Sequence, residues 1–210
     1  MWAEKVGKQL GHPTRSVGGW LISKFLKARN RVLEENAVQL LGIKPEDTVL
    51  ELGHGPGLGL QTAAKLLTKP TGRLIGVDYS TYMHQMASER LKELVASGKV
   101  TLYHCDVAAM PLEDNSVDKV FHCNCYYFWP DLQKGATEIH RVMKPGGLMV
   151  ATLRLSNVAA VAAKQLIPGE NWRPEAYMTA LTDSGFTDVR MEDKQLKYVS
   201  FQAIYATASK

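Results

Sequence analysis

A glycine-rich segment follows an apolar run that carries a single acid. The stretch reads Val49-Leu50-Glu51-Leu52-Gly53-His54-Gly55-Pro56-Gly57-Leu58-Gly59. Glycine allows tight turns and lets a ligand approach the backbone closely. A helix is predicted to begin directly afterwards, so its positive end would face the same ligand. The segment therefore predicts a turn that binds a nucleotide-like molecule.

Two common phosphate-binding spacings do not fit this turn. A P-loop requires Gly-Lys followed by Ser or Thr, which the chain lacks. A dinucleotide fingerprint starting at Gly53 or Gly55 needs its third glycine at position 58 or 60, and both positions are leucine. Glu51 would not help to bind a pyrophosphate. The pattern favours a ligand that has an ammonium group and no phosphate.

Further acids stand at the ends of two later apolar runs. Asp78 ends the run Arg73–Val77, and Asp106 follows the run Val100–Cys105. In an open α/β sheet, ligands bind outside the carboxyl ends of the strands, where the strand order reverses. Glu51 and Asp78 would therefore bring two carboxylates to the ends of neighbouring parallel strands.

Together these features resemble the class I S-adenosylmethionine-dependent methyltransferases. Within that family, the similarity is closest to the small-molecule branch that includes the ubiquinone and menaquinone C-methyltransferases. It covers about residues 45–155, and four signatures in order carry it: Glu51 to Gly57, Asp78, Cys105-Asp106-Val107, and Lys144-Pro145-Gly146-Gly147. The resemblance implies S-adenosylmethionine as cofactor, S-adenosylhomocysteine as product and a small-molecule methyl acceptor.

The resemblance also implies a set of cofactor-binding residues. Asp78 would bind the ribose hydroxyls, the Asp106 segment would read the adenine, and Asn124 would lie beside the sulfonium. Tyr79 and Met83 are expected either against the cofactor or in the core, and His54 is expected as a cofactor contact, a base or a solvated side chain. The full predicted set is Glu51, Gly53, His54, Gly55, Gly57, Asp78, Tyr79, Met83, Asp106, Val107 and Asn124.

An aromatic segment after the fourth predicted strand is expected to face the methyl group. Tyr126, Tyr127 and Trp129 would form the acceptor pocket, or alternatively a buried aromatic cluster. No catalytic residue is assigned, because the donor is already activated and a base is needed only if the acceptor must lose a proton early. His122 and His140 are expected to be structural.

Three alternative functions follow from other features. Relatives that methylate arsenic use three thiols, and the chain has Cys105, Cys123 and Cys125. The expected strand order separates the third and fourth strands by about 14 Å, so no metal site is predicted. The Asn124-Cys125-Tyr126-Tyr127 segment lacks both prolines of the nucleic-acid amino-methyltransferase motif. A non-catalytic cofactor-binding protein remains possible, because fold does not prove activity.

The elements that must position these residues alternate between apolar strands and amphipathic helices. This predicts an α/β fold with parallel strands, followed by an antiparallel hairpin. With the resemblance, it becomes a Rossmann-like, doubly wound seven-stranded sheet of order 3-2-1-4-5-7-6 whose last strand is antiparallel. The strands are expected at Thr48–Leu52, Arg73–Val77, Val100–Cys105, Asp118–Asn124, Leu148–Leu155, Thr187–Glu192 and Tyr198–Thr207, with a turn at Asp193–Lys197. Helices are expected at about 17–41, 58–67, 83–95, 132–143, 157–166 and 174–184.

Length and composition limit the number of domains and the kinds of partner. The 210 residues are predicted to form one domain, with an N-terminal helical cap at 1–41 and a cofactor-binding core at 45–207. Residues 1–20 are expected to become ordered over the bound cofactor. The net charge of +4 is small, and its density over residues 5–31 is interpreted as a solvated helix face, so no nucleic-acid partner is expected.

The remaining expectations concern location and assembly. No apolar run approaches the ~18 residues of a membrane span, and the N-terminus lacks the apolar core of a signal peptide. Three cysteines are too few for a disulfide framework and fit a reducing compartment. A cytoplasmic monomer or homodimer is expected.

Overall fold

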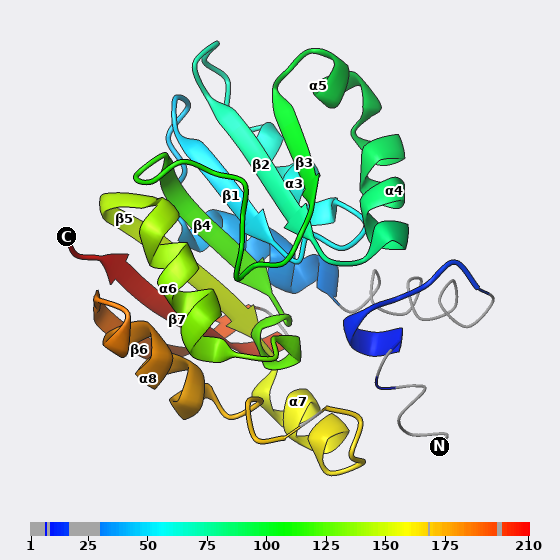
Figure 1. Ribbon diagram of the computed structural model, residues 1–210, viewed down its shortest axis with the longest axis vertical. Helices are drawn as coiled ribbons and strands as arrows, with labels where there is room; N and C mark the ends of the chain where they lie inside the picture. Colours follow the sequence, from blue (N-terminus) through cyan, green and yellow to red (C-terminus); the bar gives the residue numbers. More distant parts are fainter. Residues whose placement is uncertain (1–6, 8, 17–29, 168, 197–198) are drawn as a thin grey trace.

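A seven-stranded sheet forms the centre of the molecule (Figure 1). The computed structural model describes residues 7, 9–16, 30–167, 169–196 and 199–210. The strand order is β3-β2-β1-β4-β5-β7-β6; β1 to β5 are parallel, and β7 is antiparallel to both β5 and β6. This confirms the predicted fold. The strands are β1 Thr48–Leu52, β2 Arg73–Asp78, β3 Val100–His104, β4 Val117–Cys123, β5 Met143–Leu153, β6 Phe186–Leu196 and β7 Val199–Ala208.

Helices cover both faces of the sheet. The labelled helices are α3 Leu58–Ala64, α4 Thr81–Arg90, α5 Lys92–Ala96, α6 Leu132–Val142, α7 Leu155–Ala162 and α8 Pro174–Asp183, with a 3-10 turn η1 at Tyr126–Phe128. Residues 30–40 are also helical. One core contains the buried faces of α6 and α8, and the other contains those of the 30–40 helix and α3. Successive strand residues serve opposite cores, as Val120 and Phe121 do, because side chains alternate along a strand.

The strand order creates the crevice that positions the site. From β1 the chain continues to β2 and β3 on one side, and it then returns to place β4 on the other side of β1. The loops after β1 and β4 therefore leave the sheet on opposite faces, and a ligand can enter between them.

Four predicted helices have different bounds in the structure. The expected helix over 58–67 ends at Ala64, as α3. The expected helix over 83–95 is two helices, α4 and α5, because Leu91 between them leaves helical geometry at φ −106° and ψ 16°. The expected helix over 157–166 begins and ends earlier, as α7, and Gln165 beyond it has a left-handed φ of 56°. Of the expected helix over 17–41, residues 30–40 are helical, and 17–29 lie outside the described residues.

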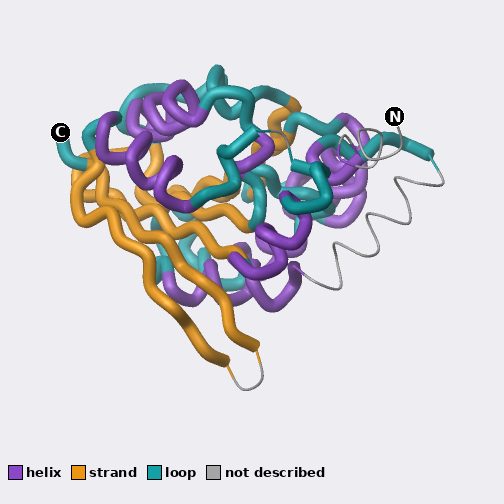
Figure 2. The backbone as a smooth tube through the Cα atoms, turned by 90° about the horizontal axis from the view of Figure 1, so that it is seen from below, coloured by secondary structure: helices purple, strands orange, loops and turns teal. Residues whose placement is uncertain are grey.

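The predicted turn of the C-terminal hairpin is also wrong. Asp193, Lys194 and Gln195 belong to β6, where they pair with Gln202, Phe201 and Ser200. Their polar side chains are accommodated because β6 is an edge strand with solvent on its free side. The resulting hairpin is long and projects from the body of the molecule (Figure 2).

Strand β5 starts earlier than expected. Met143 pairs with Val117, and the register then shifts before Lys119 pairs with Leu148. The Pro145-Gly146-Gly147 segment lies in this irregularity, with Gly146 at φ +75°.

No helix within the described part of the chain is long and apolar enough to cross a membrane.

Candidate functional site

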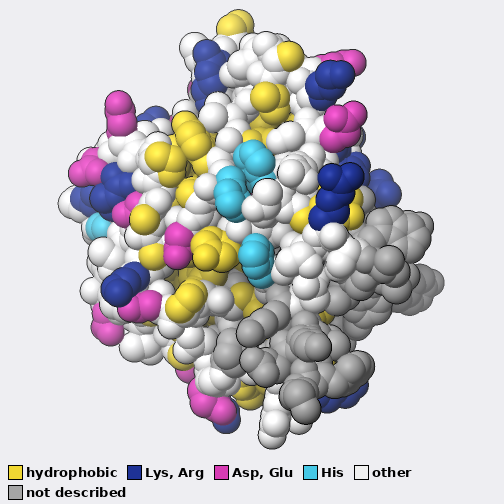
Figure 3. Space-filling model, turned by 45° about the vertical axis from the view of Figure 1, so that its right-hand side comes forward, with side chains coloured by type: hydrophobic (Ala, Val, Ile, Leu, Met, Phe, Trp, Pro, Cys, Tyr) yellow, Lys and Arg dark blue, Asp and Glu magenta, His cyan; other side chains and the backbone are white. Residues whose placement is uncertain are grey.

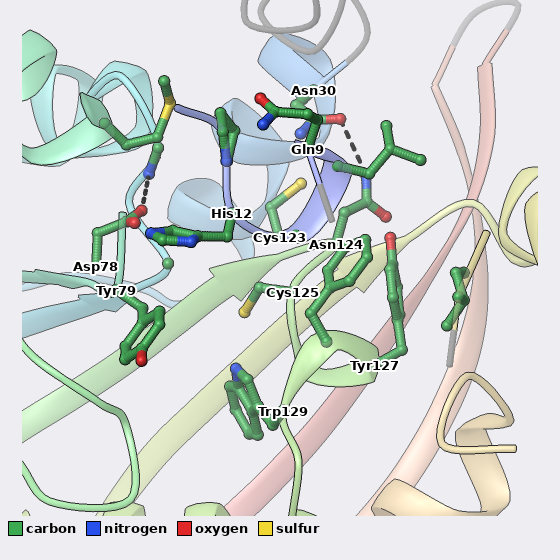
Figure 4. A pocket seen from close by; sticks show the side chains of 18 of the residues that line it. Gln9, His12, Asn30, Asp78, Tyr79, Cys123, Asn124, Cys125, Tyr127 and Trp129 are labelled. Atoms are coloured by element: carbon green, nitrogen blue, oxygen red, sulfur yellow. Dashed lines mark hydrogen bonds between the residues drawn. The ribbon is translucent and has the colours of Figure 1, made fainter. Parts of the chain in front are cut away.

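A cavity of about 900 Å³ lies at the carboxyl ends of the parallel strands. This volume is within the usual range for small-molecule sites. Figure 4 shows Asp78 and Tyr79 on one side of it and Tyr127 and Trp129 on the other. We call the first side the glycine-loop half, lined by Gly53, Gly55, Asp78, Tyr79, Met83, Asp106 and Val107, with Glu34 beside it. The second side is the aromatic half, lined by Tyr127, Phe128, Trp129, Arg154, Asn157, Val158 and Ile167.

The glycine loop is held by the end of β2. The backbone N–H groups of Gly53 and His54 both donate to the carbonyl of Val77, at 2.8 and 3.3 Å. Gly53 and Gly55 have φ values of +62° and +52°, a region that favours glycine. A Cβ at Gly55 would have no heavy atom within 4 Å, so the backbone there is open to the cavity.

Asp78 joins this loop to the segment after β2. One carboxylate oxygen accepts from the Gly55 N–H at 2.8 Å, and the other accepts from the Ser80 N–H at 2.7 Å. A carboxylate has about four lone-pair positions, so Asp78 retains acceptor capacity on both oxygens. It lines the cavity and can accept a pair of ligand hydroxyls while it holds the loop in place.

Gly57 and His54 of the same loop face away from the cavity. Gly57, at φ +81°, packs against α4, where an added Cβ would lie 3.2 Å from the Ala87 side chain. His54 is buried, with Nδ1 2.8 Å from the carbonyl of Gly55. Burial lowers the pKa of His54, so the ring is neutral at physiological pH. Neither residue lines the cavity.

Glu51 lies one layer behind the cavity lining. Its carboxylate packs against the start of α3, where a Cβ at Gly59 would collide with it. Burial raises the pKa of Glu51 well above its ordinary value, and the nearby Glu34 raises it further, while the Leu60 N–H lowers it. Glu34, on the 30–40 helix, is the carboxylate that reaches the cavity beside Glu51.

The side chain of Glu34 is buried although the residue lines the cavity. Its side chain is only 6% exposed, and one carboxylate oxygen, Oε2, has no hydrogen-bond partner in the described structure. Burial and the neighbouring Glu35 raise the pKa of Glu34 to about 7, partly offset by Arg90. A cationic ligand group would supply the missing partner and stabilise the charged form.

The other predicted residues of this half line the rim of the cavity. Tyr79 is 63% exposed, and its ring lies 5.2 Å from that of His12. Met83 is buried, and Asp106 and Val107, which follow β3, also line the cavity. Figure 3 shows histidine side chains beside hydrophobic ones on one face of the molecule. The rings of His84 and His104 have centroids 6.0 Å apart.

The predicted aromatic residues divide between cavity and core. Tyr127 and Trp129 line the cavity. Tyr126 does not, because it stacks on Tyr177 at a centroid distance of 4.4 Å and an angle of 6°, and its hydroxyl donates to the Trp172 carbonyl. His122 is fully buried below them, with Nε2 2.8 Å from the Tyr177 hydroxyl.

Asn124 stands between the two halves. It follows β4 at φ +51°, and its backbone N–H donates to the Thr152 carbonyl. Its side-chain amide donates to Asn30 Oδ1 at 3.0 Å (Figure 4). The left-handed backbone ends the strand and directs this side chain into the cavity lining.

All three cysteines line the cavity. Burial raises the pKa of Cys105 to about 11 and the pKa values of Cys123 and Cys125 well above the ordinary value. The thiols are therefore protonated at neutral pH and are poor nucleophiles and metal ligands. Within the described residues, no group of three or more His, Cys, Asp or Glu side chains is arranged to hold a metal ion.

The N-terminal segment closes one side of the cavity. Ser80 Oγ donates to the Pro13 carbonyl at 2.5 Å, which fixes this segment beside Asp78. Gly11 packs so closely on Phe128 that a Cβ there would lie 2.6 Å from the ring. The segment therefore contacts both halves. The rest of the predicted cap, residues 1–6, 8 and 17–29, lies outside the described residues.

Sequence reasoning missed two charged residues of the lining. Glu34 interrupts a buried helical stripe, since it precedes Val38 and Leu41 at the helical spacings of four and seven residues. An acid within an otherwise apolar helical stripe can be recognised in the sequence as a candidate site residue. Arg154 follows the last apolar residue of β5, where loops of this fold class meet the ligand.

The sheet order, the glycine loop and the acid at the end of β2 define the Rossmann-like fold of class I methyltransferases. A methyltransferase domain family matches residues 50–151. The uncharacterized methyltransferase YdaC of Bacillus subtilis is 30% identical over 173 residues, covering 82% of this chain and 90% of YdaC. The chain belongs to this methyltransferase family, and it is an S-adenosylmethionine-dependent methyltransferase.

Two further comparisons describe more distant similarity. A 2-phytyl-1,4-naphtoquinone methyltransferase of a Nostoc species is 30% identical over 118 residues, which are 56% of this chain and 51% of that protein. The chain thus spans about half of that relative. The structure of a SAM-dependent methyltransferase from Aquifex aeolicus superposes with a TM-score of 0.67 at 20% identity, covering 89% of this chain and 96% of that one.

Proposed function

We propose that this enzyme transfers a methyl group from S-adenosylmethionine to a small-molecule acceptor bound in the aromatic half. One observation carries the proposal. The hydrogen bond from Gly55 to Asp78 holds the glycine loop beside this carboxylate, and both residues line the same cavity as Tyr127 and Trp129. Donor and acceptor can therefore meet without any rearrangement of the sheet.

The residues of the glycine-loop half fit the chemical groups of the cofactor. Asp78 has acceptor positions left for the two ribose hydroxyls, and the open backbone at Gly55 allows close approach. The unpartnered oxygen of Glu34 suits the ammonium group, with Glu51 adding negative charge behind it. Tyr79, Asp106 and Val107 are proposed to surround the adenine, and Met83 to pack beneath it.

The cofactor supplies a methyl group on a sulfonium, which is already activated for in-line displacement. The chain's own contribution is to align and shield the reacting groups. Asn124, held by Thr152 and Asn30, is proposed to border the sulfonium. The raised pKa values of Cys123 and Cys125 keep both thiols protonated, so that they do not compete with the acceptor for the methyl group.

The dimensions of the cavity favour a small acceptor. About 900 Å³ must accommodate the cofactor and the acceptor together. The N-terminal segment lies across Ser80 and Phe128, which narrows the space for a macromolecular substrate. The relative named as a 2-phytyl-1,4-naphtoquinone methyltransferase acts, by its name, on a small molecule and not on a macromolecule.

The test is an acceptor screen that measures S-adenosylhomocysteine release across thiols, amines, phenols and quinone-like carbon acids. We expect turnover with one of these classes and tight binding of S-adenosylhomocysteine in calorimetry. Cofactor binding without turnover of any small molecule, together with methylation of a protein or nucleic acid, would overturn the proposal.

The N-terminal segment gives a second measurement. We expect hydrogen exchange over residues 7–20 to slow when S-adenosylmethionine is saturating, because residues around Pro13 would then cover the cofactor. Exchange that does not change on cofactor addition would contradict a covering role for this segment.

A further inference from the structure

Arg154 is a positively charged residue of the cavity lining. It follows β5 directly, caps α7 and lines the aromatic half of the cavity. Its Nε is buried and has no hydrogen-bond partner in the described structure. A buried donor without a partner costs free energy, so a ligand acceptor that reaches Nε would stabilise this arrangement. The residue as a whole is half-buried.

The charges that line the cavity are segregated. Its carboxylates, Glu34, Asp78 and Asp106, belong to the glycine-loop half, and the aromatic half contains no carboxylate among the described residues. Arg154 is the one lysine or arginine among the described lining residues. The acids face the half proposed for the cationic cofactor, and the single cation faces the half proposed for the acceptor.

The surroundings of Arg154 favour an anion of low charge with an apolar body. The start of α7 has no side-chain cap, so its positive end adds to the guanidinium charge. Asn157, in the first turn of α7, also lines the cavity and offers an amide donor. Around these polar groups, the lining consists of Val158, Ile167 and the aromatic rings.

We propose that Arg154 binds a carboxylate of the methyl acceptor, which is therefore a small, largely apolar acid. This inference rests on the proposed function, since it names the acceptor class of the same site. The planar guanidinium can donate two parallel hydrogen bonds to a carboxylate. One cation matches one negative charge, whereas a phosphate dianion would require a second cation that the described lining does not contain.

The experiment measures ligand preference in the intact chain saturated with S-adenosylhomocysteine. The probes are phenylacetate and octanoate, their uncharged amides, and phenyl phosphate, each titrated by calorimetry. The variants are Arg154→Gln and Arg154→Lys. Arg190→Gln is the matched control, because it removes an arginine that pairs with Glu192 outside the cavity lining.

We expect wild-type protein and the Arg190→Gln control to bind each acid about tenfold or more tightly than its amide. Arg154→Gln should abolish this preference, and Arg154→Lys should retain part of it. The affinity for S-adenosylhomocysteine should change less than about twofold in every variant, well under the 1.4 kcal/mol of a tenfold effect.

Three results would overturn the inference. Equal binding of acids and amides by the wild type would remove the carboxylate preference, and tighter binding of phenyl phosphate would assign the site to a phosphate. Loss of S-adenosylhomocysteine affinity in Arg154→Gln would assign Arg154 to the cofactor carboxylate. If the wild type does not bind S-adenosylhomocysteine, the proposed function fails, and the same titration without it decides separately whether Arg154 selects acids.

Discussion

The two halves of the cavity are formed by different parts of the chain. The glycine-loop half consists mainly of backbone and of side chains at the ends of β1, β2 and β3, and Asp78 there has both oxygens engaged. The aromatic half consists of side chains from η1, α7 and the segment up to Ile167, and Arg154 Nε there has no partner among the described residues. The glycine-loop half is held by hydrogen bonds at the strand ends, with Glu34 Oε2 left for a cationic ligand group, whereas the aromatic half is formed by side chains and leaves Arg154 Nε for an anionic one.

This difference has a physical basis. Strand ends are held by sheet hydrogen bonds, so a cofactor that is common to many reactions can be bound by a rigid rim. Short helices and turns can change their side chains without disturbing the sheet, so they suit the choice of acceptor. Variants in each half should therefore affect different measurements, in the order of decreasing effect below.

The largest effect is expected at Tyr126, which belongs to the aromatic segment but packs in the core. Tyr126→Ala removes a ring stacked on Tyr177 and should lower the free energy of unfolding by about 4 kcal/mol. Tyr126→Phe should cost only about 1 kcal/mol, through the lost hydrogen bond to Trp172. Urea unfolding measures both. Equal stability of Tyr126→Ala and wild type would show that this ring is not part of the core.

The next effect concerns Asp78. Asp78→Ala removes the acceptor for two loop N–H groups and for the ribose hydroxyls, so the affinity for S-adenosylhomocysteine should fall about 100-fold. Asp131→Ala is the control, because Asp131 also accepts a backbone N–H, that of Lys134, but lies outside the cavity lining. Calorimetry should show an unchanged affinity for the control. An unchanged affinity for Asp78→Ala would refute the ribose assignment.

Glu34 should make the stability of the free protein depend on pH. Its pKa is raised on folding from 4.5 to about 7, so the folded state binds its proton more tightly than the unfolded chain. The stabilisation is fully present below about pH 4.5 and is lost as the pH rises through about 7. Glu34→Gln should remove this loss, making the variant more stable than wild type by about 3 kcal/mol at pH 8.

Urea unfolding at pH 5 and pH 8 measures this difference. The control is Glu46→Gln, whose carboxylate is exposed and pairs with Lys69. The control should follow the wild-type dependence on pH. If the Glu34→Gln variant also follows it, Glu34 does not carry the titration.

The smallest effect separates backbone strain from ligand contact. Gly55 and Gly146 both have positive φ and open space around an added Cβ, but only Gly55 lines the cavity. Alanine at either position should cost about 1 kcal/mol of stability. Gly55→Ala alone should also weaken S-adenosylhomocysteine binding about tenfold, as measured by calorimetry. Equal affinity of both variants would mean that the ligand does not approach the backbone at Gly55.

Much of the fold was predictable because its signals are local. Alternating apolar strands and helices indicated the parallel sheet, and the two strands that follow α8 indicated the hairpin. The hairpin turn was misplaced at 193–197, because polar residues on an edge strand resemble a turn when only the sequence is considered. The single helix expected over 83–95 is divided at Leu91, whose geometry no residue type in that segment announces.

The site was predictable in part for the same reason. The residues that line the glycine-loop half, from Gly53 to Val107, are mostly those that the motifs indicated. The motifs did not reveal that Glu51, His54 and Gly57 lie outside the cavity lining, nor that Tyr126 packs on Tyr177. A spacing pattern specifies position along the chain, whereas the side of a loop that a side chain occupies depends on its neighbours in space.

By itself, the sequence determined the chemistry of the donor side, because a glycine turn and acids at strand ends act through short-range backbone geometry. Only the tertiary structure decided the charge distribution of the cavity. Glu34 reaches the lining from the 30–40 helix and Arg154 from the end of β5, so their opposite placement depends on packing between segments far apart in the chain. Local patterns do not encode such contacts, since burial and pairing across the sheet exist only once the chain has folded.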